Sequence, residues 1–176
     1  MKVRLITSYM KILLSIITIA SCLSLSGQQY LTRQGTLTFD AGSPLEDIRA
    51  TSNSATAVYD AEDGKLGVQV LMTSFKFRRA LMQEHFNENY VESEVYPKAV
   101  FKGLYKGNKA IGTLSIHGVS KDVIVPAELL KEGNTVCLKA SFALSIEDFG
   151  VGIPKAVASK IDPKAKISVD CKLQAR

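Results

Sequence analysis

The chain has two histidines, His85 and His117, and histidine is the side chain most often used to bind metals and move protons near neutral pH. His85 lies in "QEHFNE", between Glu84 and Glu88. A zinc site uses three or four close ligands, and the HExxH spacing of metalloproteases is absent. His117 precedes Gly118 at the end of a predicted strand, where a histidine usually hydrogen-bonds the turn. The spacing therefore predicts no metal site and a structural role for His117.

Nucleophile and carboxylate patterns give no stronger indication of catalysis. The G-x-S-x-G elbow of hydrolases and a glycine-rich phosphate loop are both absent. Ser115 is near His117 but falls on the polar side of its predicted strand. Paired acids occur at Glu92/Glu94 and Glu147/Asp148, but surface acids are common and nothing in the sequence indicates that these are desolvated. We therefore expect no enzyme activity, no catalytic residue and no cofactor.

Basic side chains adjoin the most irregular part of the sequence, residues 81–103, which is polar and acidic between stretches that alternate apolar and polar residues. Lys76, Arg78 and Arg79 precede it directly. One interpretation is a solvated group of charges. The other is that Arg78 or Arg79 contacts the phosphate or carbonyl head group of a ligand, because a guanidinium presents a fork of donors.

The first residues, 1–27, have the features of an export signal. Lys2, Arg4 and Lys11 precede a short apolar run, which small residues follow, and the run is too short to span a bilayer. "IASC" also fits a lipoprotein box with Cys22 as the lipidated residue, but we favour cleavage near Gly27. The protein is then periplasmic or secreted, with no transmembrane span in the mature chain.

Removal of this segment changes the charge balance of the chain. Of the 22 basic residues three lie in residues 1–27, so 19 remain against 17 acidic residues. This near balance gives no indication of nucleic-acid binding. Residues 28–176 are enough for one domain with one core. Cys137 and Cys171 have opposite parity on their predicted strands, which predicts free thiols and no disulfide between them. Whether the chain forms a homodimer is left open.

Alternation of apolar and polar residues predicts an all-β domain. We expect extended segments at residues 30–40, 48–52, 56–59, 66–77, 99–105, 111–117, 122–130, 136–146 and 167–173. About eight antiparallel strands would remove their edges by closing into a barrel. Short helices are expected after Phe77 and in "PKAVASKI", where Pro154 favours a helix start. Met82, Phe86 and Tyr90 recur every four residues and give the first helix one apolar stripe.

Inward-facing apolar residues are the candidate functional site, because an eight-stranded barrel either is filled by side chains or holds one slender ligand. The pattern alone does not separate these two interpretations. The candidates for the cavity and its lid are Val70, Met72, Phe75, Phe77, Leu81, Met82, Phe86, Tyr90, Phe101, Leu114, Ile116, Phe142, Leu144 and Phe149.

Three segments, "FRRALMQEHFNENYVESEVYPKAVFKG", "GTLSIHGVSKDVIVP" and "FALSIEDFGV", resemble successive signatures of the YceI-like family. The resemblance covers essentially residues 30–173. It implies a lipocalin-like antiparallel β-barrel, usually exported, and in some members a polyisoprenoid chain held in the barrel. Many relatives have an arginine shortly before the late "DFG", where this chain has Ile146 and Glu147.

The sequence therefore favours an exported carrier that holds an isoprenoid or another lipid or amphiphile without transforming it. The alternative is a structural or protein-interaction module of the cell envelope with a filled barrel.

Overall fold

The computed structural model describes residues 28–176, so the predicted export signal and Cys22 lie outside the described residues. The strands are β1 (Gln29–Gly42), β2 (Arg49–Asp60), β3 (Lys65–Leu71), β4 (Lys76–Phe77), β5 (Lys98–Tyr105), β6 (Lys109–Ile116), β7 (Val119–Glu132), β8 (Thr135–Ser145) and β9 (Ile161–Ala175). Helical segments are α2 (Ala80–His85), the π-helical η2 (Phe86–Tyr90), and the 3₁₀ turns η1 (Met72–Ser74), η3 (Glu147–Phe149) and η4 (Lys155–Val157).

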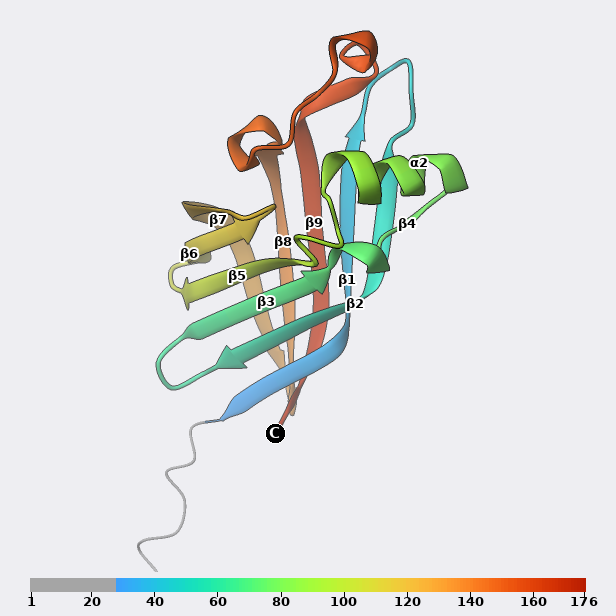
Figure 1. The fold of residues 1–176 in the computed structure, drawn as a ribbon. Coiled ribbons are helices and arrows are strands. Elements are labelled where there is room, and N and C mark those ends of the chain that lie inside the picture. The colour runs from blue at the N-terminus through green and yellow to red at the C-terminus, as the bar shows by residue number, and fades with distance from the viewer. Residues whose placement is uncertain (1–27) are drawn as a thin grey trace, which may run out of the picture.

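Eight of these strands close into an antiparallel barrel, as the sequence predicts (Figure 1). The order β1-β9-β8-β7-β6-β5-β3-β2 returns to β1, because β1 pairs with both β2 and β9. The two-residue β4 adds to β2 beside this ring. Closure leaves no long unpaired edge among the described strands, and it is complete within residues 28–176.

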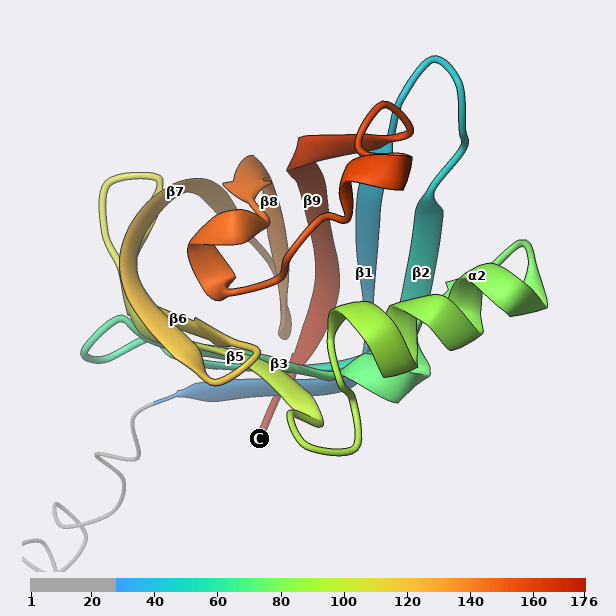
Figure 2. The same ribbon diagram turned by 45° about the horizontal axis from the view of Figure 1, so that its top comes forward.

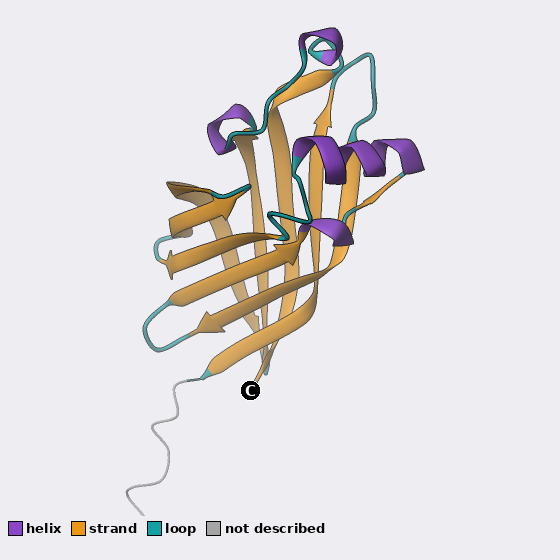
Figure 3. Cartoon of the chain, in the orientation of Figure 1, coloured by secondary structure: helices purple, strands orange, loops and turns teal. Residues whose placement is uncertain are grey.

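Connections at the two ends of the barrel differ in character. Tight turns join β2 to β3, β5 to β6 and β7 to β8 at the end where the C-terminus lies, and Gly64, Gly107 and Gly133 take positive φ there. The helical segments gather at the other end (Figures 2 and 3). Tight polar turns need little space, whereas the helical connections carry apolar residues that must be buried. One end of the barrel is therefore closed by tight turns, and the other carries the longer helical connections.

Two sequence predictions about strand boundaries were wrong. Residues 48–52 and 56–59 belong to one continuous strand, β2, which pairs with β1 across register shifts near Gly35. Residues 66–77 are not one strand, because the 3₁₀ turn at Met72–Ser74 separates β3 from β4. This turn resets the alternation, so Val70 and Phe75 are both buried although they differ in parity. Leu71, at the end of β3, is exposed.

Both described cysteines are free thiols. Cys171 on β9 is fully buried in the barrel interior, and Cys137 on β8 is partly exposed on the other face of the sheet. Burial raises the pKa of the Cys171 thiol to about 11, and the negative charge of Asp170 contributes to the same shift. No helix among the described residues is long and apolar enough to cross a membrane.

Candidate ligand cavity

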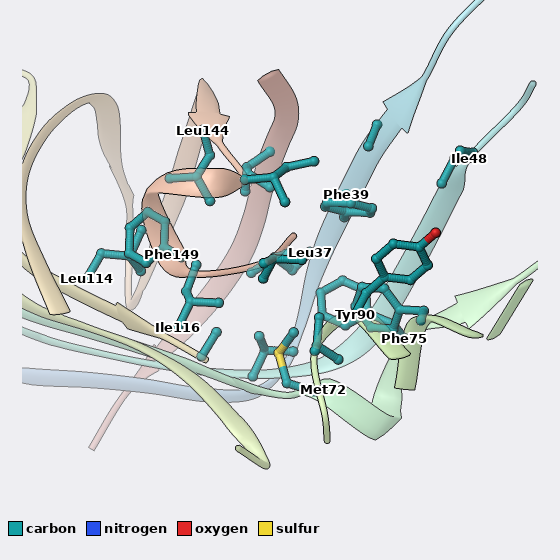
Figure 4. A pocket seen from close by; sticks show the side chains of 18 of the residues that line it. Leu37, Phe39, Ile48, Met72, Phe75, Tyr90, Leu114, Ile116, Leu144 and Phe149 are labelled. Atoms are coloured by element: carbon teal, nitrogen blue, oxygen red, sulfur yellow. The ribbon is translucent and has the colours of Figure 1, made fainter. Parts of the chain in front are cut away.

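The barrel is not filled by its own side chains. It encloses a cavity of about 450 Å³, which is within the usual range for small-molecule sites in proteins. The buried apolar residues of the interior form two clusters, one that includes Leu114 and Phe149 and one that includes Leu37 and Met72. Residues of both clusters line this space (Figure 4). The filled barrel of the alternative hypothesis therefore does not describe this structure.

Small residues on the inward face of neighbouring strands create the space. Ala110 of β6, Ala127 of β7 and Ala140 of β8 all line the cavity, and Ala127 and Ala140 are direct partners across the sheet. Gly103 and Gly112 are opposite one another on β5 and β6 and contribute no side chain. Larger residues at these positions would meet across the interior, as they do in barrels with a packed centre. The wall formed by β5 to β8 is therefore thin and the interior stays hollow.

Aromatic packing closes the end of the cavity nearest the C-terminus. The rings of Tyr30 and Tyr59 stack with centroids 6.3 Å apart, and Tyr105 meets Tyr59 edge-on at 6.2 Å. None of these three tyrosines lines the cavity. Tyr30 is fully buried, and its hydroxyl has no hydrogen-bond partner among the described residues. The cavity therefore ends above this cluster.

A lid formed by α2 and η2 covers part of the other end. Met82, Phe86 and Tyr90, the stripe that the sequence predicts, all line the cavity. Phe86 is the centre of an aromatic cluster, with ring centroids 4.9 Å from Phe77, 5.8 Å from Phe39 and 5.9 Å from Phe75. The α-helix ends at His85 and continues as one π-helical turn, which keeps Tyr90 on the stripe.

His117 joins three segments beside this lid. Its Nδ1 lies 3.2 Å from the carbonyl oxygen of Phe149, and its Nε2 lies 2.9 Å from a carboxylate oxygen of Glu92. The ring of Tyr96 packs edge-on against the imidazole at 4.6 Å. A Cβ at the next residue, Gly118, would lie 2.6 Å from the Tyr96 ring, so only glycine fits there. The predicted structural role of His117 is confirmed, although its partners come from other segments and not from its own turn.

The solvent-exposed residues among those that line the cavity mark its mouth. Four of the lining residues are exposed, and they are Arg79, Leu81, His85 and Lys160. Three of these four carry basic side chains. Glu46 is the one acidic residue of the lining, and it pairs with Arg79 across the gap between the β1–β2 loop and the start of α2. The interior is thus apolar, and hydrogen-bond donors are concentrated where it opens.

The structure brings together the residues predicted from the sequence. All fourteen apolar candidates line the cavity, and so does Arg79. Arg78 is exposed and does not line it, so the two arginines are separated. That any of these residues binds a ligand stays a prediction.

Sequence reasoning missed more than half of the lining residues. Residues of β1, the β1–β2 loop and β9 are among those missed, and they include Leu37, Phe39, Ile48, Ile167 and Val169. Their alternating pattern was visible in the sequence, but their position in the wall depends on closure of the barrel between β1 and its partners β2 and β9. Lys160 was missed because nothing in "PKAVASKI" separates a rim lysine from a solvated one.

Other chemistry finds no support among the described residues. No group of three or more histidine, cysteine, aspartate or glutamate side chains within residues 28–176 could hold a metal ion. The hydroxyl of Ser115 hydrogen-bonds that of Ser120 at 2.7 Å, whereas the ring nitrogens of His117 face Phe149 and Glu92. The arrangement is suited to enclosing an apolar molecule.

An antiparallel eight-stranded barrel around an apolar cavity is the architecture of lipocalin-like proteins. The model of the YceI-like domain matches residues 31–173 of this sequence. The chain therefore belongs to the YceI-like family.

Solved structures share this fold at low sequence identity. BcnA of Burkholderia cenocepacia is 17% identical with a TM-score of 0.67, and the match covers 79% of this chain and 95% of that one. A polyisoprenoid binding domain from Saccharophagus degradans, implicated in plant cell wall breakdown, is 10% identical with a TM-score of 0.70, and the match covers 84% and 98%. The YCEI protein of Campylobacter jejuni is 19% identical with a TM-score of 0.56, covering 70% and 80%. No functionally curated protein matches the chain.

Proposed function

We propose that this protein binds an isoprenoid or similar amphiphilic lipid in the barrel cavity and carries it without chemical change. The observation that carries the proposal is the cavity of about 450 Å³, which is lined mainly by apolar side chains and has its charged residues at the mouth. Each methylene group taken from water contributes about 0.8 kcal/mol, so a long hydrocarbon is held tightly without polar recognition. The polyisoprenoid-binding domain with the same fold supports this ligand class.

The mouth favours a ligand with an acceptor-rich or anionic head group. Arg79, His85 and Lys160 surround the opening, and Arg79 is already held in place by Glu46. A guanidinium has five N–H donors, so one that pairs with a carboxylate still has N–H groups that point away from it. A phosphate or carbonyl group of a ligand can accept hydrogen bonds from these groups. A prenyl chain in the barrel would place its head group among these side chains.

Extraction of the protein purified from its native source tests the proposal. Organic solvent followed by mass spectrometry should release a prenyl lipid or similar amphiphile in an amount equimolar with the protein. An empty extract from protein that is folded and freshly isolated would contradict the carrier function.

Arg79→Ala tests the head-group assignment, with Arg78→Ala as the matched control. Arg78 is the adjacent arginine, exposed and outside the lining. We expect Arg79→Ala to weaken binding of a prenyl phosphate about tenfold or more, while binding of the corresponding prenyl alcohol changes much less. Equal effects of the two substitutions on the phosphate would remove Arg79 from the site.

We also propose that residues 1–27 direct export and are removed. The basic start, the apolar run and the small residues that follow support this. Amino-terminal sequencing and mass measurement of the protein from its native cells should give a chain that begins at Gln28 in a periplasmic or secreted fraction. A lipid-modified Cys22 would instead establish the lipoprotein alternative, and an intact Met1 in the cytoplasm would contradict export.

A further inference from the structure

The outer surface of the barrel carries a row of exposed aliphatic side chains on three adjacent strands. Leu104 on β5 is the direct partner of Ile111 on β6, and Ile111 is the direct partner of Ile124 on β7. Their side chains are 48%, 40% and 66% exposed. Neighbouring strands are about 4.8 Å apart, so the three side chains form one contiguous apolar row. Figure 1 shows these strands side by side in one wall of the barrel.

Lysines flank this row on β5 and β6. The β5–β6 hairpin, residues 98–116, contains Lys98, Lys102, Lys106 and Lys109 and no acidic residue. All four lysines are exposed, and none forms a salt bridge with another described residue. On β5 the outward positions alternate between lysine and aliphatic residues. We call this surface the β5–β7 face, and it consists of Lys98, Lys102, Leu104, Lys106, Lys109, Ile111 and Ile124.

We propose that the β5–β7 face docks the protein on the surface of a bilayer that contains anionic phospholipids. Aliphatic tips enter the interface between head groups and acyl chains, while lysine ammonium groups reach the phosphates on flexible stems. The proposal concerns the outside of the barrel and does not depend on which ligand the cavity holds.

Charge argues against a second copy of the chain as the occupant. A twofold contact through this face would bring the lysine-rich surface of one copy against that of the other, and juxtaposed like charges are unfavourable. The carboxylates that border the row already have partners within the chain. Asp63 forms an ion pair with Lys65, which is the direct partner of Leu104. Asp122 accepts a hydrogen bond from Thr113 at 2.8 Å, and Glu128 lies further along the strand.

Composition argues against a protein partner. The centres of protein–protein interfaces are enriched in tyrosine, tryptophan and arginine and depleted in lysine. The outward positions of β5, β6 and β7 include no aromatic residue and no arginine. The combination of lysine and aliphatic side chains is typical of surfaces that bind anionic membranes.

Vesicle flotation tests the proposal with the chain that begins at Gln28, because the barrel closes within residues 28–176 and the apolar segment before it would bind lipid itself. The parent should bind phosphatidylcholine vesicles that contain phosphatidylglycerol, and high salt should release it. It should bind pure phosphatidylcholine vesicles weakly. No binding to the anionic vesicles at low salt would overturn the proposal.

Charge reversal locates the docking surface. Each lysine at an anionic surface contributes roughly fivefold to the partition coefficient, so Lys102→Glu with Lys109→Glu should lower it roughly 30-fold or more. The control is Lys164→Glu with Lys172→Glu, which changes net charge equally on the outer face of β9, where the outward residues include no exposed aliphatic side chain. Similar losses for both pairs would show general attraction and overturn the assignment.

A neutral substitution tests the aliphatic row. Ile124→Ser should lower the partition coefficient roughly fivefold, because the side chain no longer enters the interface. Leu45→Ser is the control, since Leu45 is 70% exposed on the β1–β2 loop, away from the β5–β7 face. Equal binding by the parent and Ile124→Ser would contradict the proposal. A parent dimer that Ile124→Ser dissociates, without vesicle binding, would assign the face to a second copy.

Discussion

Ala140→Phe is expected to block the cavity without disturbing the barrel. Ala140 is on β8, between Ala127 on β7 and Val169 on β9, and its side chain lines the cavity. A phenylalanine there would place a ring of six carbons in the space that a ligand chain needs. The ring has room, because the cavity is about 450 Å³.

The magnitude follows from the carbons displaced. A ligand chain that loses burial of about six methylene equivalents, at about 0.8 kcal/mol each, loses about 5 kcal/mol of binding free energy. This corresponds to a dissociation constant larger by roughly three to four orders of magnitude. Burial of the new ring should leave the melting temperature unchanged or raise it, as cavity-filling substitutions do.

Displacement of a fluorescent apolar probe by a prenyl alcohol is a suitable assay, with calorimetry to follow folding. The matched control is Ala143→Phe, three residues along β8 on the outward face and exposed. The control should bind like the parent. If folded Ala140→Phe bound the prenyl alcohol within tenfold of the parent, the cavity would not be the binding site.

Three further predictions concern stability. Gly112→Ala should destabilise the barrel by about 1–3 kcal/mol, because the new Cβ would lie 2.2 Å from the carbonyl oxygen of Lys102. Gly67→Ala is the control, since its Cβ would have no atom nearer than 4.0 Å and should not destabilise the barrel. Equal midpoints of urea unfolding for the two variants would refute this prediction. The folded-state pKa of Cys171 is about 11 against an ordinary value of 9.0, so the unfolded chain loses its proton first as pH rises. Stability should therefore fall by about 2–3 kcal/mol between pH 9 and pH 11, and Cys171→Ala should remove this part of the decline; identical pH profiles for the two proteins would contradict it. His117→Ala should cost about 1–3 kcal/mol because the ring joins three segments, while His85→Ala, at an exposed position, should cost little; thermal unfolding of both variants distinguishes them.

Strand positions were largely predictable because each strand has one buried and one exposed face. The segments predicted at residues 99–105, 111–117 and 136–146 differ from β5, β6 and β8 by at most two residues at either end. The break at Met72–Ser74 was signalled by the change of parity after Leu71. Its form was not, because a 3₁₀ turn within a chain of extended residues has no distinctive composition.

The hollow interior could not be derived from alternation. Inward-facing residues such as Leu114 and Phe142 would be the same in a filled barrel and in an open one. The difference depends on which small residues face each other across strands, as Ala127 and Ala140 do, and on closure between β1 and β9 at opposite ends of the chain. These are long-range relations that no local window of sequence contains.

The central claim is that the barrel interior accepts a hydrocarbon chain from water, and calorimetric titration tests it most directly. A prenyl alcohol titrated into the chain that begins at Gln28 should bind in equimolar amount with a negative change in heat capacity, the mark of apolar burial. Heat of dilution alone at every temperature, with folded and lipid-free protein in the cell, would contradict the account.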